Sequence, residues 1–577
     1  MKIFFIIFIF VIKLYSETDI IKVDEIKSGM RGRCRTVFEG IKIEDIEVEI
    51  IGVLKNARAG SDLILAKLLG ERIKDTGVIA GMSGSPVYIS NKIAGAVAFS
   101  WAFSKEPITA ITPIENMIEL SKRKFITNLY NFEPNLIEEK DNNNLNFLPI
   151  KSPLVFSGVS ENSINLFKKD FEKFGFIPMA GPGIDNLQTN IEKFEPGSPV
   201  GVNIITGDLN LTAIGTVTYV KDDTILIFGH PLFFSGASDI PLSYAYIHTV
   251  VPSLYHSFKI GSPTKIAGRI YQDELFGLAG KLNQFSKMIP LNLEINYAGN
   301  YKNYNFNIIK SYTLLPQFIG LCIMRGIESI AGLLQKNTLN FKFEIFFDNN
   351  KKITLNDTIP GITLTESLNS GMLFMLNPLS QIIVNKFENL NIEKMKIKLD
   401  IVPTIKVFEI KNILVDKTEY EAGEIVNAKI LLKAYQGEKI YKEMKFKLPK
   451  NLKPGNFILV ASSAKEAQYI DFILSPAKYN PYNLDQLIDI FNNLSKNNEL
   501  ALWSIIRERG LVMDGQIFER IPSSYYFIIQ DSIDKRANPV LTMLSEKLDL
   551  DYVLIGNAMY SIKIVDSVKE IKKENRK

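Results

Sequence analysis

Residues 76–88, TGVIAGMSGSPVY, place a serine in a glycine-rich turn between two apolar runs. A serine hydroxyl attacks a carbonyl well when a turn exposes it, a base accepts its proton, and backbone N–H groups receive the developing oxyanion. Gly81 has no side chain to cover its own N–H, and Pro86 stiffens the chain after the turn. We therefore interpret Ser83 as a candidate nucleophile, with the N–H groups of Gly81 and Ser83 as the oxyanion hole. The alternative is an ordinary tight turn.

A second motif, at residues 215–231, contains a histidine at the end of an apolar run. Its sequence, GTVTYVKDDTILIFGHP, predicts a β-hairpin with a turn at residues 221–223. The chain has three histidines, and His230 is the one held between a glycine and a proline at a strand end. An imidazole with a pKa near neutral is the base that a serine nucleophile needs. We therefore interpret His230 as the candidate general base.

The two motifs resemble those of the SpoIVB-type serine peptidases, a family with the chymotrypsin-like double β-barrel. The resemblance also includes residues 93–97 (IAGAV) and the glycines of residues 268–280, and it covers roughly residues 20 to 310. It implies a serine endopeptidase with a protein or peptide substrate. In the sporulation peptidase the histidine motif comes first, whereas here Ser83 precedes His230. This permuted order is compatible with catalysis, because geometry and not chain order defines such a site.

The sequence leaves open which acid, if any, orients His230. The aspartate that the sporulation peptidase carries before its serine does not transfer, since its position falls near Leu68. We rank two aspartates first and two others behind them, in this order: Asp62 and Asp239, then Asp75 and Asp273. Each also fits an ordinary strand end or turn. A Ser–His dyad, or a degenerate site that only binds peptide, is the alternative.

Residues 1–16 have the features of a secretory signal peptide. A charged start is followed by an apolar run at residues 3–12 and by the small residue Ser16. The run is too short to span a bilayer comfortably, and no cysteine near Ser16 is placed for lipidation. We therefore expect a secreted or periplasmic protein of the cell envelope, with no stable membrane span once the signal is removed.

The composition and charge of the chain argue against some classes of binding partner. The chain has 577 residues, of which 46% are hydrophobic and 23% charged, enough for several folded domains. Its net charge of +4 is spread along the chain, which argues against nucleic acid as a partner. Metal-ligand spacing is absent, and we expect no cofactor. Cys34 and Cys322 lie far apart in sequence, so we expect free buried thiols.

The pattern of alternating strands predicts a mainly β fold, with a β-sandwich-like module and an α+β C-terminal region after residue 400. For the part before them, the resemblance implies a chymotrypsin-like double β-barrel built from two separated halves. The expected boundaries are a signal peptide at 1–16, a serine-motif barrel half at 17–120, a linker with a strand and a helix at 121–200, a histidine-motif barrel half at 201–312, a helix and strand connecting region at 313–400, the sandwich-like module at 401–475 and the C-terminal region at 476–577.

Helices are expected at Ile114 and, as a buried helix, at residues 314–334, and three more are expected farther along or between these segments. One begins after Ser160 and another after Asn483, because these residue types cap helix N-termini. A third is expected near residues 541–548.

Two function classes remain. In the first, the protein is a secreted serine endopeptidase in which Ser83 attacks and His230 carries the proton. In the second, it is a non-catalytic cell-envelope binding or scaffold protein that keeps a peptidase-like fold. The first class predicts that Ser83 and His230 lie within hydrogen-bond reach, and the second predicts that they do not or that the groove is plugged.

Overall fold

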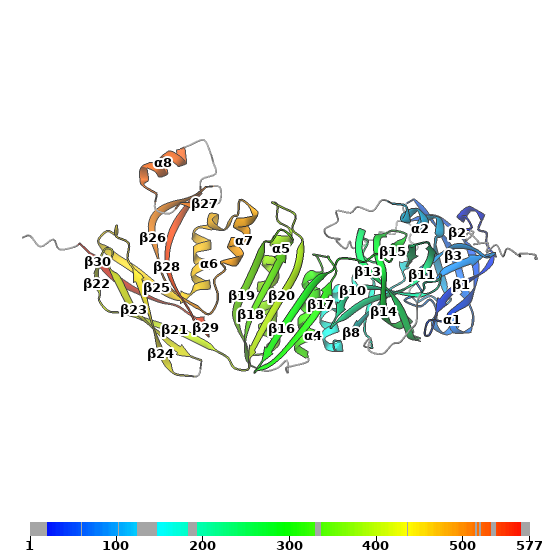
Figure 1. The fold of residues 1–577 in the computed structure, drawn as a ribbon, viewed down its shortest axis with the longest axis horizontal. Coiled ribbons are helices and arrows are strands. Elements are labelled where there is room, and N and C mark those ends of the chain that lie inside the picture. Colours follow the sequence, from blue (N-terminus) through cyan, green and yellow to red (C-terminus); the bar gives the residue numbers. More distant parts are fainter. Residues whose placement is uncertain are drawn as a thin grey trace, which may run out of the picture. The chain divides into compact units, whose positions relative to one another are not determined.

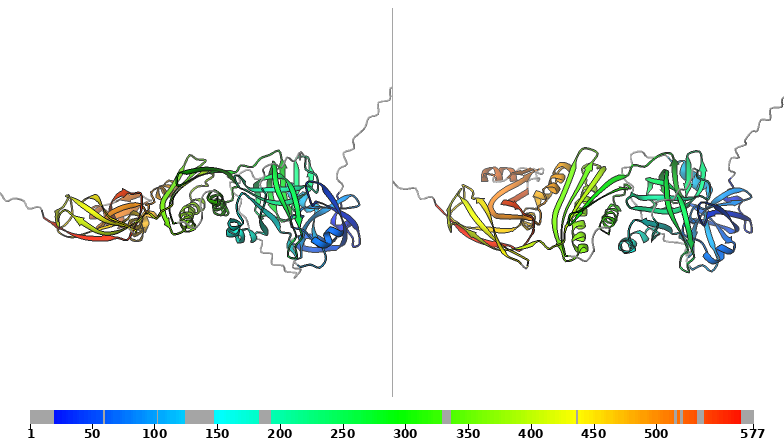
Figure 2. Two further views of the ribbon diagram at one scale, coloured as in Figure 1. Left: turned by 90° about the horizontal axis from the view of Figure 1, so that it is seen from below. Right: turned by 60° about the horizontal axis from the view of Figure 1, so that its bottom comes forward.

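The computed structural model describes residues 20–566 except 59, 102, 124–146, 183–192, 329–335, 436, 514–515, 519–520 and 532–537. The expected signal peptide lies outside the described residues, as do residues 124–146 and 183–192 of the expected linker. The chain is mainly β, as predicted, and divides into two compact units (Figures 1 and 2). Unit 1 consists of Met1–Met288 and Phe306–Leu321, and unit 2 of Ile289–Asn305 and Cys322–Lys577.

Unit 1 begins with a closed barrel of six strands. The strands pair in the order β4-β1-β2-β3-β6-β5, and β5 also pairs with β4, which closes the ring. Apolar side chains that alternate along these strands fill its interior, among them Val48, Ile64 and Val97. The elements are a 3-10 turn at Val23–Glu25, β1 (Arg31–Val37), β2 (Ile43–Arg58), β3 (Ser61–Leu69), α1 (Glu71–Thr76), β4 (Pro86–Ile89), β5 (Lys92–Ser100), β6 (Ile108–Pro113), α2 (Ile114–Ser121) and β7 (Leu148–Pro149).

The second sheet of unit 1 pairs in the order β10-β13-β14-β15-β12-β11-β8-β9. Because β10 also pairs with β11, six of its strands form a second ring of pairings. The expected hairpin at 215–231 is confirmed, since β11 and β12 pair antiparallel. The likeness of the two rings to the chymotrypsin double barrel stays a prediction. The elements are β8 (Ser152–Ser157), α3 (Glu161–Glu172), β9 (Phe176–Ala180), β10 (Pro199–Gly207), β11 (Asn210–Lys221), β12 (Thr224–Ile227), β13 (Gly236–Val251), β14 (Phe258–Glu274) and β15 (Gly277–Leu282).

Unit 2 begins with a sheet in the order β19-β18-β20-β16-β17. Its β16 and β20 run parallel, and α5 packs against the sheet through the ring contact of Phe374 with Phe341. The elements are β16 (Ile289–Tyr297), β17 (Asn300–Ile308), α4 (Leu315–Glu328), β18 (Asn337–Phe347), β19 (Lys352–Gly361), α5 (Leu364–Ile383) and β20 (Ile392–Val402); the last residues of β17 and the first of α4 belong to unit 1.

The rest of unit 2 contains two further sheets with a common apolar core. One has the order β24-β23-β21-β29, and the other β22-β30-β25-β26-β27, with β28 paired to β26. Strands beyond residue 475 therefore complete both sheets. The elements are β21 (Val407–Val415), β22 (Glu419–Glu421), β23 (Ile425–Ala434), β24 (Lys439–Lys447), β25 (Gly455–Ser463), α6 (Ala464–Leu474), a 3-10 turn at Pro476–Tyr479, α7 (Leu484–Asn492), β26 (Glu499–Met513), β27 (Gln516–Phe518), α8 (Ser523–Asp531), β28 (Asn538–Asp549), β29 (Val553–Ile555) and β30 (Ala558–Val565).

The helices expected at Ile114 and within residues 314–334 are confirmed as α2 and α4, and of the other three, two are confirmed and one is wrong. Ser160 caps α3 by accepting from the N–H of Ser163, and Asn483 caps α7 by accepting from the N–H of Gln486. Residues 541–548 instead belong to β28, which pairs with β26 along most of its length. The cross-strand pairing outweighs a local apolar spacing that fits either element.

Two smaller expectations concern the thiols and the membrane. Cys34 and Cys322 are free and buried, as predicted. Within the described residues, no helix has both the length and the apolar character needed to cross a bilayer.

Candidate functional site

The serine turn, residues 77–85, connects α1 to β4. Inside the turn, the N–H of Met82 donates to the carbonyl of Ile79 (3.0 Å), and the N–H of Ser85 donates to the carbonyl of Met82 (2.8 Å). Gly81 and Gly84 have φ angles of 94° and 93°, a backbone region that strongly favours glycine. The glycines recognised in the sequence are therefore required by the conformation of the turn.

Both rings of unit 1 hold this turn. On the side of the first ring, the N–H of Gly84 donates to the carbonyl of Val97 in β5 (2.8 Å). On the side of the second ring, three groups of β11 donate to carbonyls of the turn. They are Thr216 N–H to Ser83 (2.9 Å), Thr216 Oγ1 to Gly81 (2.9 Å) and Thr218 Oγ1 to Gly84 (2.7 Å). A Cβ atom on Gly84 would lie 2.0 Å from the Thr216 carbonyl oxygen and 2.5 Å from the Phe228 nitrogen. The turn is thus fixed at the seam between the rings.

Ser83 carries a polar group without a partner. Its side chain is 0% exposed, and its Oγ has no hydrogen-bond partner among the described residues. The N–H groups of Gly81 and Ser83 likewise donate to no acceptor in the described part of the chain. Since buried polar groups are normally paired, this hydroxyl and these donors call for a functional explanation.

His230 follows β12 on the same seam. Phe228 and Gly229 have φ angles of 69° and 68°, which turn the chain before the histidine. The Gly229 carbonyl accepts from Thr112 Oγ1 (2.6 Å), and a Cβ atom on Gly229 would lie 2.9 Å from that of Ala96. The close approach of Gly84 to Phe228 therefore brings the histidine segment against the serine turn.

The tautomer of His230 follows from its hydrogen bond to Pro231, while the backbone of Ile150 also acts on the ring and opposes the lowering of its pKa. Nδ1 lies 2.8 Å from the carbonyl oxygen of Pro231, and because a carbonyl only accepts, Nδ1 carries the proton. Nε2 is then an acceptor, and it is buried with no partner among the described residues. Burial, assisted by the positive charge of Arg58, lowers the pKa of His230 to about 4. The imidazole is therefore neutral at pH 7, and its pKa lies below the near-neutral value expected from the sequence because the ring is buried.

Ser83 and His230 do not hydrogen-bond to each other in this structure. The first-ranked aspartates have other partners: Asp62 accepts from Lys55 Nζ (2.8 Å) and from the N–H of Asn56 (2.9 Å), and Asp239 accepts from Arg269 and from the N–H of Lys287. The Lys55 ammonium also lowers the pKa of Asp62. No hydrogen bond connects either carboxylate to His230.

Asp273, ranked lower in the sequence, lies closer to the histidine segment. Its side chain is 0% exposed and accepts from the N–H groups of Leu232 (2.8 Å) and Phe233 (2.7 Å) and from Ser235 Oγ (3.3 Å). Burial raises its pKa to about 6. Asp273 therefore fixes the backbone just after His230 without touching the imidazole.

Sequence reasoning missed Lys259, in β14. This lysine is 0% exposed, and its side chain lies against Gly81 of the serine turn. In the sequence, Lys259 lies in a run of alternating strand residues. A surface lysine has the same local pattern, so the sequence does not show that Lys259 is buried.

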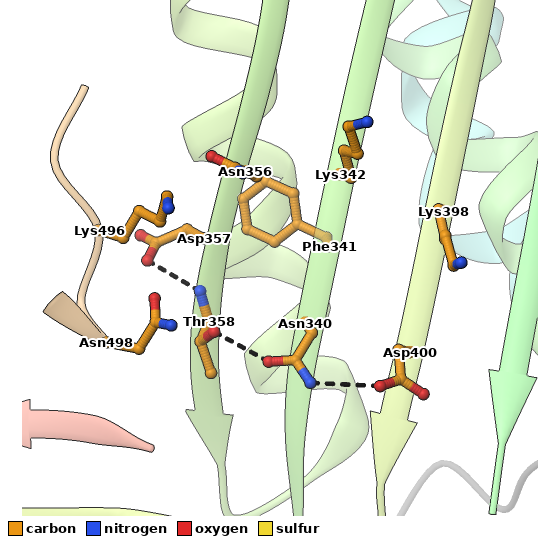
Figure 3. Close-up of a pocket in the computed structure, with 10 residues that line it drawn as sticks. All are labelled: Asn340, Phe341, Lys342, Asn356, Asp357, Thr358, Lys398, Asp400, Lys496 and Asn498. Atoms are coloured by element: carbon orange, nitrogen blue, oxygen red, sulfur yellow. Dashed lines mark hydrogen bonds between the residues drawn. The ribbon is translucent and has the colours of Figure 1, made fainter. Parts of the chain in front are cut away.

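Unit 2 contains a polar hollow of about 300 Å³ on β18, β19 and β20 (Figure 3). Asn340 connects its two sides, because it accepts from Thr358 Oγ1 (2.8 Å) and donates to Asp400 (3.4 Å). The other carboxylate of the hollow, Asp357, accepts hydrogen bonds from Lys465 Nζ and from neighbouring amide groups. The hollow contains none of the predicted site residues, and its carboxylates already have protein partners.

The described residues contain no group of three or more His, Cys, Asp or Glu side chains that could hold a metal ion.

Comparison with known proteins identifies one family. Residues 11–118 match the family model described as SpoIVB peptidase S55. The matched stretch includes Ser83 and ends before His230, so it does not test the order of the two motifs. No curated protein and no solved structure matches the chain. The resemblance predicted from the sequence is thus confirmed for residues 11–118.

Proposed function

We propose that this protein is a secreted or periplasmic serine endopeptidase of the SpoIVB type. Ser83 Oγ attacks the carbonyl carbon of a peptide bond while His230 Nε2 accepts its proton. The N–H groups of Gly81 and Ser83 stabilise the oxyanion. His230 then gives the proton to the leaving amine, and water hydrolyses the acyl-enzyme in the same way.

One observation carries this proposal. The two atoms that the chemistry requires, Ser83 Oγ and His230 Nε2, are both buried and unpartnered among the described residues, on segments packed against each other through Gly84 and Phe228. A scaffold that only kept the fold would gain stability by pairing or replacing these groups. Catalytic use explains the two groups that the chemistry requires, although Ser85 Oγ on the same turn is also buried and unpartnered in the described part of the chain.

The oriented imidazole supports a Ser–His dyad. The Pro231 carbonyl accepts a hydrogen bond from Nδ1–H and so orients the imidazole, which is one function that an aspartate has in a triad. Asp273 holds the following backbone, so it positions that carbonyl indirectly. Because Ser83 is 0% exposed, entry of a peptide requires the side chains around the seam to rearrange.

The test is covalent labelling of the full chain with a fluorophosphonate probe, in which Ser83 Oγ attacks phosphorus and fluoride leaves. We expect the native protein to label, and Ser83→Ala and His230→Ala to lose labelling while their circular dichroism spectra stay native. Loss of an entire catalytic group costs at least about a hundredfold in rate.

Ser85→Ala is the matched control. Ser85 is also 0% exposed and its Oγ also lacks a partner in the described part, but it lies two residues from the proposed nucleophile. We expect Ser85→Ala to label like the native protein. A folded native protein that does not label, or labelling that survives Ser83→Ala, would refute the proposal and favour the non-catalytic alternative.

A further inference from the structure

Lys259 lies at the point where β14 meets the serine turn. Its N–H donates to the carbonyl of Ala80 (3.1 Å), and the N–H of Ala80 donates to the carbonyl of Ser257 (2.8 Å). These bonds attach the start of the turn to β14. The lysine is therefore fixed next to the turn by its backbone as well as by its side chain.

The side chain passes directly over Gly81. A Cβ atom on Gly81 would lie 3.2 Å from Cδ of Lys259 and 3.4 Å from its Cβ and Cγ. The methylene groups of the lysine thus occupy the space that a side chain at position 81 would fill. They restrict the peptide unit that carries the proposed Gly81 oxyanion donor.

The amine end is anchored in the first barrel. Nζ donates to Oγ1 of Thr36 (2.8 Å), in β1, and both side chains are 0% exposed. No carboxylate of the described residues forms an ion pair with Lys259. A fully buried ammonium without a counter-charge is strongly unfavourable.

The groups of β1 and of the serine turn that surround this amine supply no negative charge to balance an ammonium. Thr36 accepts the hydrogen bond of the amine from β1, the Cys34 thiol of the same strand acts on its pKa, and Gly81 of the serine turn lies against its methylene groups. Burial raises the pKa of the Cys34 thiol to about 12, so this group is neutral at pH 7 and supplies no negative charge. Burial also lowers the pKa of Lys259 from its ordinary 10.5 to about 7.

We propose that Lys259 is a positioning residue of the serine site: packed on Gly81 and anchored on Thr36, it holds the turn that carries the oxyanion donors. This inference rests on the proposed function. It adds a pH dependence that His230 alone would not give. Above about pH 7 the amine is neutral and the turn is held. At lower pH a buried ammonium without a counter-charge disturbs the turn.

The experiment measures the rate of fluorophosphonate labelling against pH for the native chain, for Lys259→Met and for Lys265→Met. Methionine keeps most of the methylene contact with Gly81 but has no amine. Lys265 is an exposed residue of the same strand and serves as the control. For the native chain and the control, we expect labelling to fall as pH drops below about 7.

For Lys259→Met we expect two changes. The acid limb moves toward pH 4, where His230 takes up its proton. The maximal rate falls about tenfold, because the anchoring hydrogen bond to Thr36 is lost. If Lys259→Met does not fold, Thr36→Val gives the second test, since it keeps the lysine and removes its acceptor; we expect a similar fall in rate.

A second readout does not depend on catalysis. Between pH 7 and 10.5 the unfolded chain binds a proton at Lys259 that the folded chain does not, so the urea midpoint rises with pH. Lys259→Met should lose this part of the slope, whereas Lys265→Met should keep it.

Each outcome has one meaning. Labelling of Lys259→Met with the native rate and acid limb overturns the role of Lys259 and leaves the serine peptidase intact. A native chain that does not label at any pH overturns both, whatever the urea slope shows.

Discussion

At the scale of single residues, the site depends on groups whose charge state is set by burial. Asp273 is an example, because it accepts two backbone N–H bonds after His230 while fully buried. In Asp273→Asn the amide replaces one acceptor oxygen with a donor, which then faces an N–H group. We expect a loss of about 1–3 kcal/mol in the free energy of unfolding, and slower probe labelling, since the Pro231 carbonyl is less well placed.

The measurement is urea unfolding together with the labelling rate. Asp222→Asn, in the exposed turn between β11 and β12, is the control and should change neither quantity. A full labelling rate in a destabilised Asp273→Asn would show that Asp273 supports the fold but not the imidazole.

These residues also show what the sequence can and cannot predict. Ser83 was identified because glycine and proline define its turn locally, and His230 because a hairpin ends there. The roles of Asp273 and Lys259 depend on contacts with segments distant in the chain, such as Lys259 with Thr36. No local pattern distinguishes a buried lysine on a strand from an exposed one.

At the scale of elements, the serine turn is held by its close approach to the β11–β12 hairpin. A methyl group on Gly84 would lie 2.0 Å from the Thr216 carbonyl oxygen, and backbone atoms have little room to move. We expect Gly84→Ala to lose about 3 kcal/mol or more of unfolding free energy, and to lose probe labelling because the turn no longer fits the seam.

Gly77→Ala separates this clash from backbone strain. Gly77 also has a positive φ, of 65°, but no atom lies within 4 Å of an added Cβ. The strain at such a position costs about 1–3 kcal/mol. If Gly84→Ala and Gly77→Ala lost the same free energy of unfolding in urea, the β11–β12 hairpin would have moved to make room for the methyl group and would not hold the turn.

Elements also differ in how far the sequence predicts them. The caps of α3 and α7 are local, so Ser160 and Asn483 marked these helices correctly. The strand β28 was mistaken for a helix because its conformation depends on β26, some forty residues earlier in the chain. Strand order and ring closure likewise depend on distant partners.

At the scale of the whole molecule, the sandwich-like part of unit 2 is completed by the C-terminal strands. β29 pairs with β21, and β30 pairs with β25 and β22, so one sheet receives β29 and the other β30. The sequence predicts a boundary at residue 475, which would place β29 and β30 in a different region from their partners β21, β22 and β25. Sequence alternation shows that such strands exist but not which sheet receives them.

Truncation of the full chain after residue 549 tests this dependence. It removes five buried residues from the common core, of which four have large side chains, Tyr552, Leu554, Ile562 and Ile564, and the fifth is Ala558. At about 1.5–3 kcal/mol for each large apolar side chain, the loss of roughly 6–12 kcal/mol equals the typical stability of a domain. We therefore expect hydrogen exchange in β21, β23 and β25 to lose its protection. Truncation after residue 566 removes only the charged tail and should preserve that protection. Probe labelling at Ser83, in unit 1, should persist in both chains, because unit 1 has its own core; protected exchange after truncation at 549 would show that the sandwich folds without β29 and β30.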